Sequence, residues 1–92
     1  MSDHEFEAFK ASALAKGFSE VLVREWAPQQ VVDLHTHPFD VMAQVVRGEL
    51  WLTVGDKIRH LKVGDTFSLE KSVPHVERYG VQGATFWVAR AN

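Results

Sequence analysis

Three histidines are the residues whose type and spacing point most directly to chemistry: His35, His37 and, much later in the chain, His75. Side chains at alternate positions of a β-strand lie on one face, so a strand here would present His35 and His37 together, with Val32 and Leu34 facing away. Two imidazoles on one strand and a third from elsewhere make a facial set of ligands for a divalent metal. The pattern predicts a metal site at these three histidines.

Two further residues share the predicted strand face of His75. If a strand continues from His75, Glu77 and Tyr79 point to the same side. Tyr79 could donate a hydrogen bond to an oxygen atom bound at the metal, and Glu77 could orient an imidazole or act as a base. They are our two candidate catalytic residues. The alternative is a tyrosine at the rim of the domain and a glutamate that faces solvent.

The composition indicates one small domain and argues against some classes of partner. A chain of 92 residues has room for a single hydrophobic core. A net charge of −2, without a run of Lys or Arg, argues against a nucleic-acid partner. The absence of cysteine excludes disulfides and thiolate ligands. The start of the chain is polar and no apolar run could span a membrane, so we expect a cytoplasmic protein without a membrane partner.

The hydrophobic pattern predicts one helix followed by short strands. A helix is expected over residues 3–16, where apolar side chains recur at helical spacing. From residue 18 onward, runs rich in β-branched and aromatic residues alternate with turn residues. Among the breaks, we expect turns at 47–48 and at 80–83. The predicted strands are 20–26, 30–35, 41–47, 50–54, 57–61, 66–69, 75–78 and 84–90.

One predicted strand is apolar on both faces. Val41, Ala43 and Val45 share one face, while Met42 and Val46 take the other. A strand of this kind must be covered on both sides. The N-terminal helix or a second subunit is the available cover. We therefore predict a homodimer that buries part of the outer face.

The two histidine segments resemble the two motifs of the cupin superfamily. The first stands as His35-Thr36-His37, running to Gly48, and the second as Gly64-Asp65, running to Val73-Pro74-His75. The resemblance covers roughly residues 17–89. It implies an all-β fold, the cupin double-stranded β-helix or jelly-roll barrel, with one short N-terminal helix and a metal inside the barrel mouth. Residues 1–17 would form the helix, packed on the barrel or on a dimer partner, and 18–92 the barrel.

The sequence departs from the cupin pattern at one ligand position. Cupins usually carry Glu or Gln, the fourth protein ligand, where this chain has Val41. A valine cannot bind metal, and Asp40 would point to the other face of the strand. We therefore expect three neutral imidazoles to hold the ion, a set that favours zinc, iron(II) or nickel.

Three functions fit these expectations. The resemblance includes the thiol dioxygenases, cupins that hold iron(II) with three histidines, and so implies a dioxygenase-like enzyme; zinc would instead suit a hydrolase- or isomerase-like activity on a small molecule. The second reading is a non-catalytic module that binds a small ligand. The third is a structural barrel with a vestigial metal site. The sequence does not decide whether the protein is an enzyme, because a fold does not assign chemistry.

Overall fold

Two long, bent strands organise the fold. In the computed structural model, which describes residues 3–91, β3 (Asp40–Val54) and β6 (His75–Ala91) run antiparallel and pair along most of their length. Residues 1, 2 and 92 lie outside the described residues, so the predicted limits of the helix and the barrel can be followed only within 3–91.

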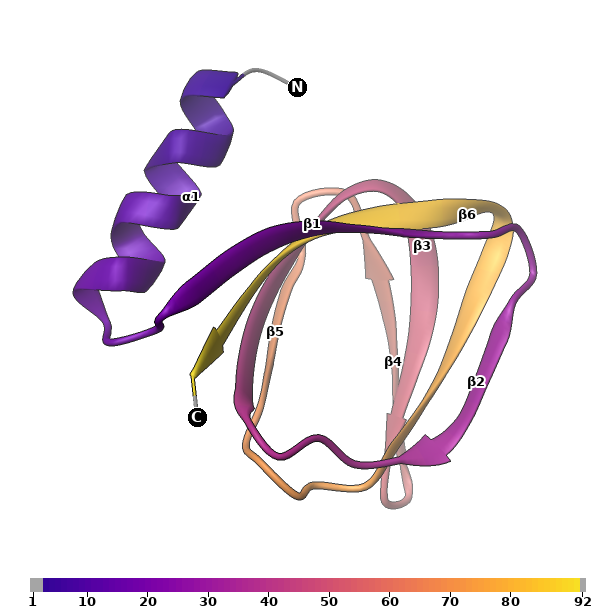
Figure 1. Cartoon of the computed structure of the whole chain (residues 1–92). Coiled ribbons are helices and arrows are strands. Elements are labelled where there is room, and N and C mark those ends of the chain that lie inside the picture. Colours follow the sequence, from indigo (N-terminus) through magenta and orange to yellow (C-terminus); the bar gives the residue numbers. More distant parts are fainter. Residues whose placement is uncertain (1–2, 92) are drawn as a thin grey trace.

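Each long strand takes part in both layers of a barrel. The second half of β6 pairs with β1 (Glu20–Trp26), and the first half of β3 pairs with β5 (Thr66–Leu69). The first half of β6 pairs with β2 (Val31–His35), and the second half of β3 with β4 (Lys57–Lys62). The two layers, β1-β6-β3-β5 and β2-β6-β3-β4, close around one interior (Figure 1). This arrangement confirms the predicted double-stranded β-helix.

The turns expected at 47–48 and 80–83 are wrong, because both segments lie inside continuous, bent strands. The register of β3 against β6 shifts on either side of Gly48. Gly48 and Gly83 have positive φ angles of 73° and 70°. A Cβ on Gly48 would clash with the carbonyl oxygen of Gly83, and one on Gly83 with that of Trp26. Glycine is required here because three strands approach closely at a bulge, and not because the chain reverses.

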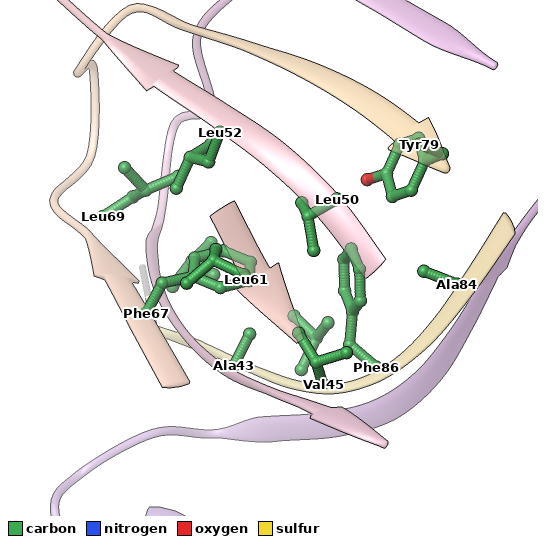
Figure 2. Packing of buried hydrophobic residues seen from close by; sticks show 12 residues of the cluster. Ala43, Val45, Leu50, Leu52, Leu61, Phe67, Leu69, Tyr79, Ala84 and Phe86 are labelled. Carbon is green, nitrogen blue, oxygen red and sulfur yellow. The ribbon is translucent and has the colours of Figure 1, made fainter. Parts of the chain in front are cut away.

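The hydrophobic core fills the space between the two layers (Figure 2). Val41, Ala43 and Val45 point inward from β3, as the alternation predicts, and are at most 8% exposed. Figure 2 also shows Phe67 and Leu69 of β5 beside residues of β3, and the hydroxyl of Tyr79 on the inner side of its strand. The buried cluster consists of Val41, Ala43, Val45, Leu50, Leu52, Leu61, Phe67, Leu69, Tyr79, Ala84, Phe86 and Val88.

Helix α1 (Asp3–Ala15) lies outside the barrel (Figure 1). Phe6 and Phe9 pack on the ring of Trp87, with centroid separations of 5.6 and 5.7 Å. Trp87 pairs with Gln44 on the outer face of β6, so the helix supplies part of the cover that this face needs. Within residues 3–91, no helix is long and apolar enough to cross a membrane. The homodimer stays a prediction.

Candidate metal centre

The three histidines converge at one end of the barrel. His35 is the last residue of β2, and His75 is the first residue of β6. His37 lies in the connection from β2 to β3, which runs beside the connection from β5 to β6 (Figure 1). The amide N–H of Ser72 donates to the carbonyl of His37 over 2.8 Å and ties the two connections together. Sequence parity placed His37 beside His35 on one strand face. In the structure His37 lies beyond the end of β2, yet its side chain is still next to His35.

A bulge in β2 changes which residues face the barrel interior. Val32 pairs with Glu77, and His35 pairs with His75, with a register shift between them. Val32 consequently packs against the core, whereas Leu34 is 69% exposed. The expectation that Val32 faces away from the site is wrong. One extra residue in the strand reverses the alternation on which that expectation rested.

Four potential ligand groups face one another at this end of the barrel. One donor atom from each of His35, His37, His75 and Glu77 lies within 4.8 Å of all the others. Oε2 of Glu77 is 3.3 Å from Nε2 of His35 and 3.5 Å from Nε2 of His75. Nε2 of His37 is 3.2 Å from Nε2 of His75. The three expected histidines thus come together, and a carboxylate joins them.

Backbone carbonyls orient two of the imidazoles. Nδ1 of His35 lies 2.7 Å from the carbonyl oxygen of Asp33, and Nδ1 of His75 lies 3.0 Å from that of Val73. A carbonyl only accepts, so each Nδ1 carries the proton and donates it. In a neutral ring the proton on Nδ1 leaves Nε2 with a free lone pair. Second-sphere contacts of this kind fix the tautomer of metal-binding histidines.

Glu77 and Tyr79 are both buried, so the alternative of a rim tyrosine and a solvent-facing glutamate is wrong. Their exposed fractions are 7% and 1%. The hydroxyl of Tyr79 donates to Oε1 of Glu77, which turns Oε2 toward the histidines. Burial and the adjacent Glu77 carboxylate raise the pKa of Tyr79, so the phenol keeps its proton and remains a donor. Tyr79 therefore stands behind the carboxylate.

The surroundings of His37 favour its neutral form. Burial lowers the pKa of His37, and the positive charge that His75 and His35 would carry lowers it further. A neutral imidazole is the form that coordinates a metal ion. The electrostatics of the site thus leave His37 ready to act as a ligand near neutral pH.

A cavity of about 90 Å³ adjoins the four donor groups. Its other walls are mainly apolar and include Val41, Phe67, Leu69 and Phe86. Val41 is buried at the position where the resemblance leads one to expect a fourth ligand. The site therefore combines polar donors on one side with an apolar wall on the other, as small-molecule sites commonly do.

Asp40 is engaged elsewhere, as strand parity suggested. Its Oδ1 accepts a hydrogen bond of 2.8 Å from the amide of Lys71, and it is not among the four grouped donors. Sequence parity did place Glu77 on the inner face, with the role of orienting an imidazole or acting as a base, and not of a ligand. The position of its carboxylate beside them depends on the packing of β6 against β2, which a single strand pattern does not contain.

A small jelly-roll barrel with histidines and a glutamate at one end is the class of protein that fold and site define. The chain belongs to the cupin family, since the family model of the cupin domain matches residues 22–79. None of the curated proteins matches the sequence.

Solved structures share the fold at low sequence identity. A protein of unknown function from Rhizobium leguminosarum has a TM-score of 0.72 and 18% identity over 76% of this chain and 66% of its own. The DMSP lyase DddQ from Ruegeria pomeroyi has a TM-score of 0.71 and 20% identity, over 78% of this chain but 37% of its own. The chain therefore spans about two thirds of the first relative and little more than a third of the second.

A third structure with this fold is CENP-C from Drosophila melanogaster, in complex with CAL1. It has a TM-score of 0.66 and 15% identity over 77% of this chain and 60% of its own. The fold thus occurs both in a lyase and in a protein bound to another protein. These likenesses establish the fold alone, and the function must be argued from the site.

Proposed function

We propose that this protein is a metal-dependent enzyme that acts on a small molecule, and that His35, His37, His75 and Glu77 hold its divalent ion. The observation that carries the proposal is the meeting of these four donor groups beside a largely apolar cavity. Three imidazole nitrogens and one carboxylate oxygen suit zinc, iron(II) or nickel.

A positive charge at the centre of the donor set would stabilise it. Nε2 of His35 and Nε2 of His75 point toward Oε2 of Glu77, at 3.3 and 3.5 Å, and in the neutral rings whose Nδ1 donates to a carbonyl these Nε2 atoms carry lone pairs. Lone pairs that face one another repel unless a cation or a proton lies between them. The lowered pKa of His37 disfavours a second proton on its ring, but the neutral ring can still donate from Nε2 to Nε2 of His75 over 3.2 Å. A divalent cation would satisfy all four groups together.

Glu77 would supply the carboxylate that Val41 does not. It comes from β6, whereas Val41 lies on β3, and both line the same cavity. One negative charge offsets half of the charge of a divalent ion and strengthens its retention. The expectation of a purely neutral ligand set is accordingly replaced by a proposed set of three histidines and one glutamate.

When bound, such an ion supplies a Lewis acid that polarises oxygen atoms of a substrate or of water. The protein's own residues would position the ligands of the ion and the substrate. Tyr79 holds the Glu77 carboxylate in place, and the carbonyls of Asp33 and Val73 hold the two imidazoles. Val41, Phe67 and Phe86 keep water from much of the cavity and accept the apolar part of a ligand.

Metal analysis of the protein, purified without chelator, tests the proposal. We expect about one zinc, iron or nickel ion per chain, removed by chelation and restored by titration with zinc(II). Replacement of His35, His37 and His75 by alanine should abolish this binding. His60→Ala is the matched control, because His60 also faces a carboxylate, at 2.5 Å from Glu49, but on the outer surface. A wild-type protein that binds no ion, or binds it equally well after the triple replacement, would contradict the proposal.

A further inference from the structure

Strand β1 brings a second set of polar groups to the cavity. Its register pairs Arg24 with Phe86 and Trp26 with Ala84. Directly paired residues of antiparallel strands point to the same side of the sheet. Phe86 and Ala84 belong to the buried core, so Arg24 and Trp26 face the interior of the barrel, and both line the cavity beside the four donor groups.

Arg24 lines this cavity as an exposed residue, and its guanidinium has no carboxylate partner there. Within the described part of the chain, no ion pair involves its guanidinium. Its Cζ lies over the ring of Trp26, 4.8 Å from the centroid, a contact that orients the side chain and leaves its N–H groups free. Arginine is suited to bind carboxylates, because its planar fork donates two parallel hydrogen bonds.

Trp26 adds an unsatisfied donor next to this guanidinium. Among the side chains of residues 3–91, Nε1 of Trp26 is a buried polar atom without a hydrogen-bond partner. A buried donor without a partner costs free energy, so native structures rarely keep one unless another group completes it. The ring is held in place by stacking on Tyr79, with a centroid separation of 5.1 Å and an angle of 11°. The wall lined by Arg24 and Trp26 therefore carries a guanidinium and, covered beneath the surface, an indole donor without an acceptor.

We propose that the cavity takes a small carboxylate with a short apolar chain, and that Arg24 and Trp26 bind its carboxylate group. This inference rests on the proposed function, because it names the class of molecule that would occupy the proposed metal site. Arg24, Glu77 and a divalent ion together give the cavity a net charge of about +2, which favours an anion. A volume of about 90 Å³ has room for roughly six non-hydrogen atoms.

The apolar walls account for the rest of the ligand. Phe67, Leu69, Phe86 and Val88 line the cavity away from the polar groups and would contact a short aliphatic chain. Butyrate, with six non-hydrogen atoms, matches this size and polarity. Butyramide has nearly the same shape but no charge, so the pair isolates the contribution of the carboxylate.

NMR of the indole N–H groups tests the proposal directly. The signal of Trp26 is assigned by its loss in Trp26→Phe, and the protein is titrated with straight-chain acids from acetate to hexanoate and with butyramide, in metal-free and zinc-loaded form. We expect butyrate to shift this signal in a saturable manner and butyramide to bind at least about tenfold more weakly. A panel in which no acid binds, or in which butyramide binds as well as butyrate, would overturn the inference.

Variants of Arg24 separate this site from direct binding to the ion. We expect Arg24→Gln to weaken butyrate binding about tenfold or more, with Arg24→Lys in between. Arg78→Gln is the matched control, because Arg78 also lies over a tryptophan, 4.4 Å from the centroid of Trp51, but does not line the cavity. Equal butyrate affinity in Arg24→Gln and wild type would show that the ion alone holds the carboxylate and would overturn the inference.

The same titrations distinguish the two proposals. Zinc affinity should be essentially unchanged in Arg24→Gln, because Arg24 is not one of the four donor groups. A wild-type protein that binds butyrate through Arg24 but no metal would remove the proposed function and leave the anion site. A protein that binds zinc, but whose butyrate affinity does not depend on Arg24, would retain the proposed function and remove the carboxylate site.

Discussion

The hydroxyl of Tyr79 donates a hydrogen bond to Oε1 of Glu77, and the other oxygen of the same carboxylate lies 3.3 Å from Nε2 of His35. Tyr79 and Glu77 are two residues apart on β6 and share its inner face with His75. A tyrosine that does not itself line the cavity thus determines where a carboxylate points. Tyr79 is accordingly a positioning residue, and its effect on the site passes through Glu77.

Removal of this hydroxyl should weaken metal binding at the site while the barrel stays folded. In Tyr79→Phe we expect the affinity for zinc to fall about tenfold, because Glu77 loses the donor that orients it. The free energy of unfolding should fall by about 1–3 kcal/mol, since the buried carboxylate loses a partner. Competition with a chromophoric chelator measures the first quantity and urea denaturation the second. Unchanged zinc affinity would show that the orientation of Glu77 does not depend on Tyr79.

Replacement of Glu77 by glutamine should have a larger effect on metal binding than Tyr79→Phe. The amide has the same shape but removes the negative charge and leaves a weaker oxygen ligand. We expect a loss of zinc affinity greater than that of Tyr79→Phe, toward about a hundredfold. Glu49→Gln is the matched control, since Glu49 faces His60 on the outer surface, and it should bind zinc as wild type does. Equal affinity in the Glu77→Gln and Glu49→Gln proteins would exclude Glu77 from the ligand set.

The sequence predicted the topology well because the relevant signals are local. Alternation placed Val41 and Val45 on one face of their strand, which is the buried face in the structure, and the two histidine motifs, by their resemblance to cupins, led to the double-stranded β-helix. The sequence-based prediction was wrong where a glycine is required by a close contact between strands and not by a turn. Gly48 has the pattern of a turn residue, but its neighbour in space is Gly83, far along the chain, and only the folded barrel shows how closely the two backbones approach.

The candidate site shows the same division. The three histidines could be named from their spacing, and parity put Glu77 and Tyr79 on the inner face of their strand. Arg24 was not predicted as a site residue, because an arginine in a strand is usually exposed, and Arg24 is exposed although it also lines the cavity. Its place in the cavity follows from the register of β1 against β6, where it is paired with Phe86. Register across strands distant in sequence is the information that a single sequence did not supply.

The stability of the metal-free protein should depend on pH through His37. Burial lowers the pKa of this residue from its ordinary value of 6.5, with His75 and His35 adding to the effect. The unfolded chain therefore binds more protons just below pH 6.5 than the folded one, so stability falls as the pH drops from above 6.5 through the folded pKa of His37. Thermal unfolding between about pH 7.5 and 5 should show this decline, and His37→Gln should reduce it. An identical decline in the variant would assign it to other groups.

The homodimer predicted from the two apolar faces of β3 can be checked by mass. Helix α1 covers Trp87, while Met42 and Val46 on the outer side of β3 remain partly exposed. We expect sedimentation equilibrium to give about twice the chain mass of 10.4 kDa. A mass of one chain that does not change with concentration would contradict this prediction.

The close approach of β3 and β6 at Gly48 and Gly83 should be the position least tolerant of an added methyl group. Gly48 needs a positive φ of 73°, and a Cβ there would meet the backbone of Gly83 and Ala84. Gly55 has a similar φ of 61° but nothing within 4 Å, so Gly55→Ala carries the conformational penalty alone. We expect urea denaturation to give a loss of at least about 3 kcal/mol for Gly48→Ala and about 1 kcal/mol for Gly55→Ala. Equal losses of unfolding free energy in the two variants would mean that β3 and β6 can move apart at Gly48 to make room for the methyl group.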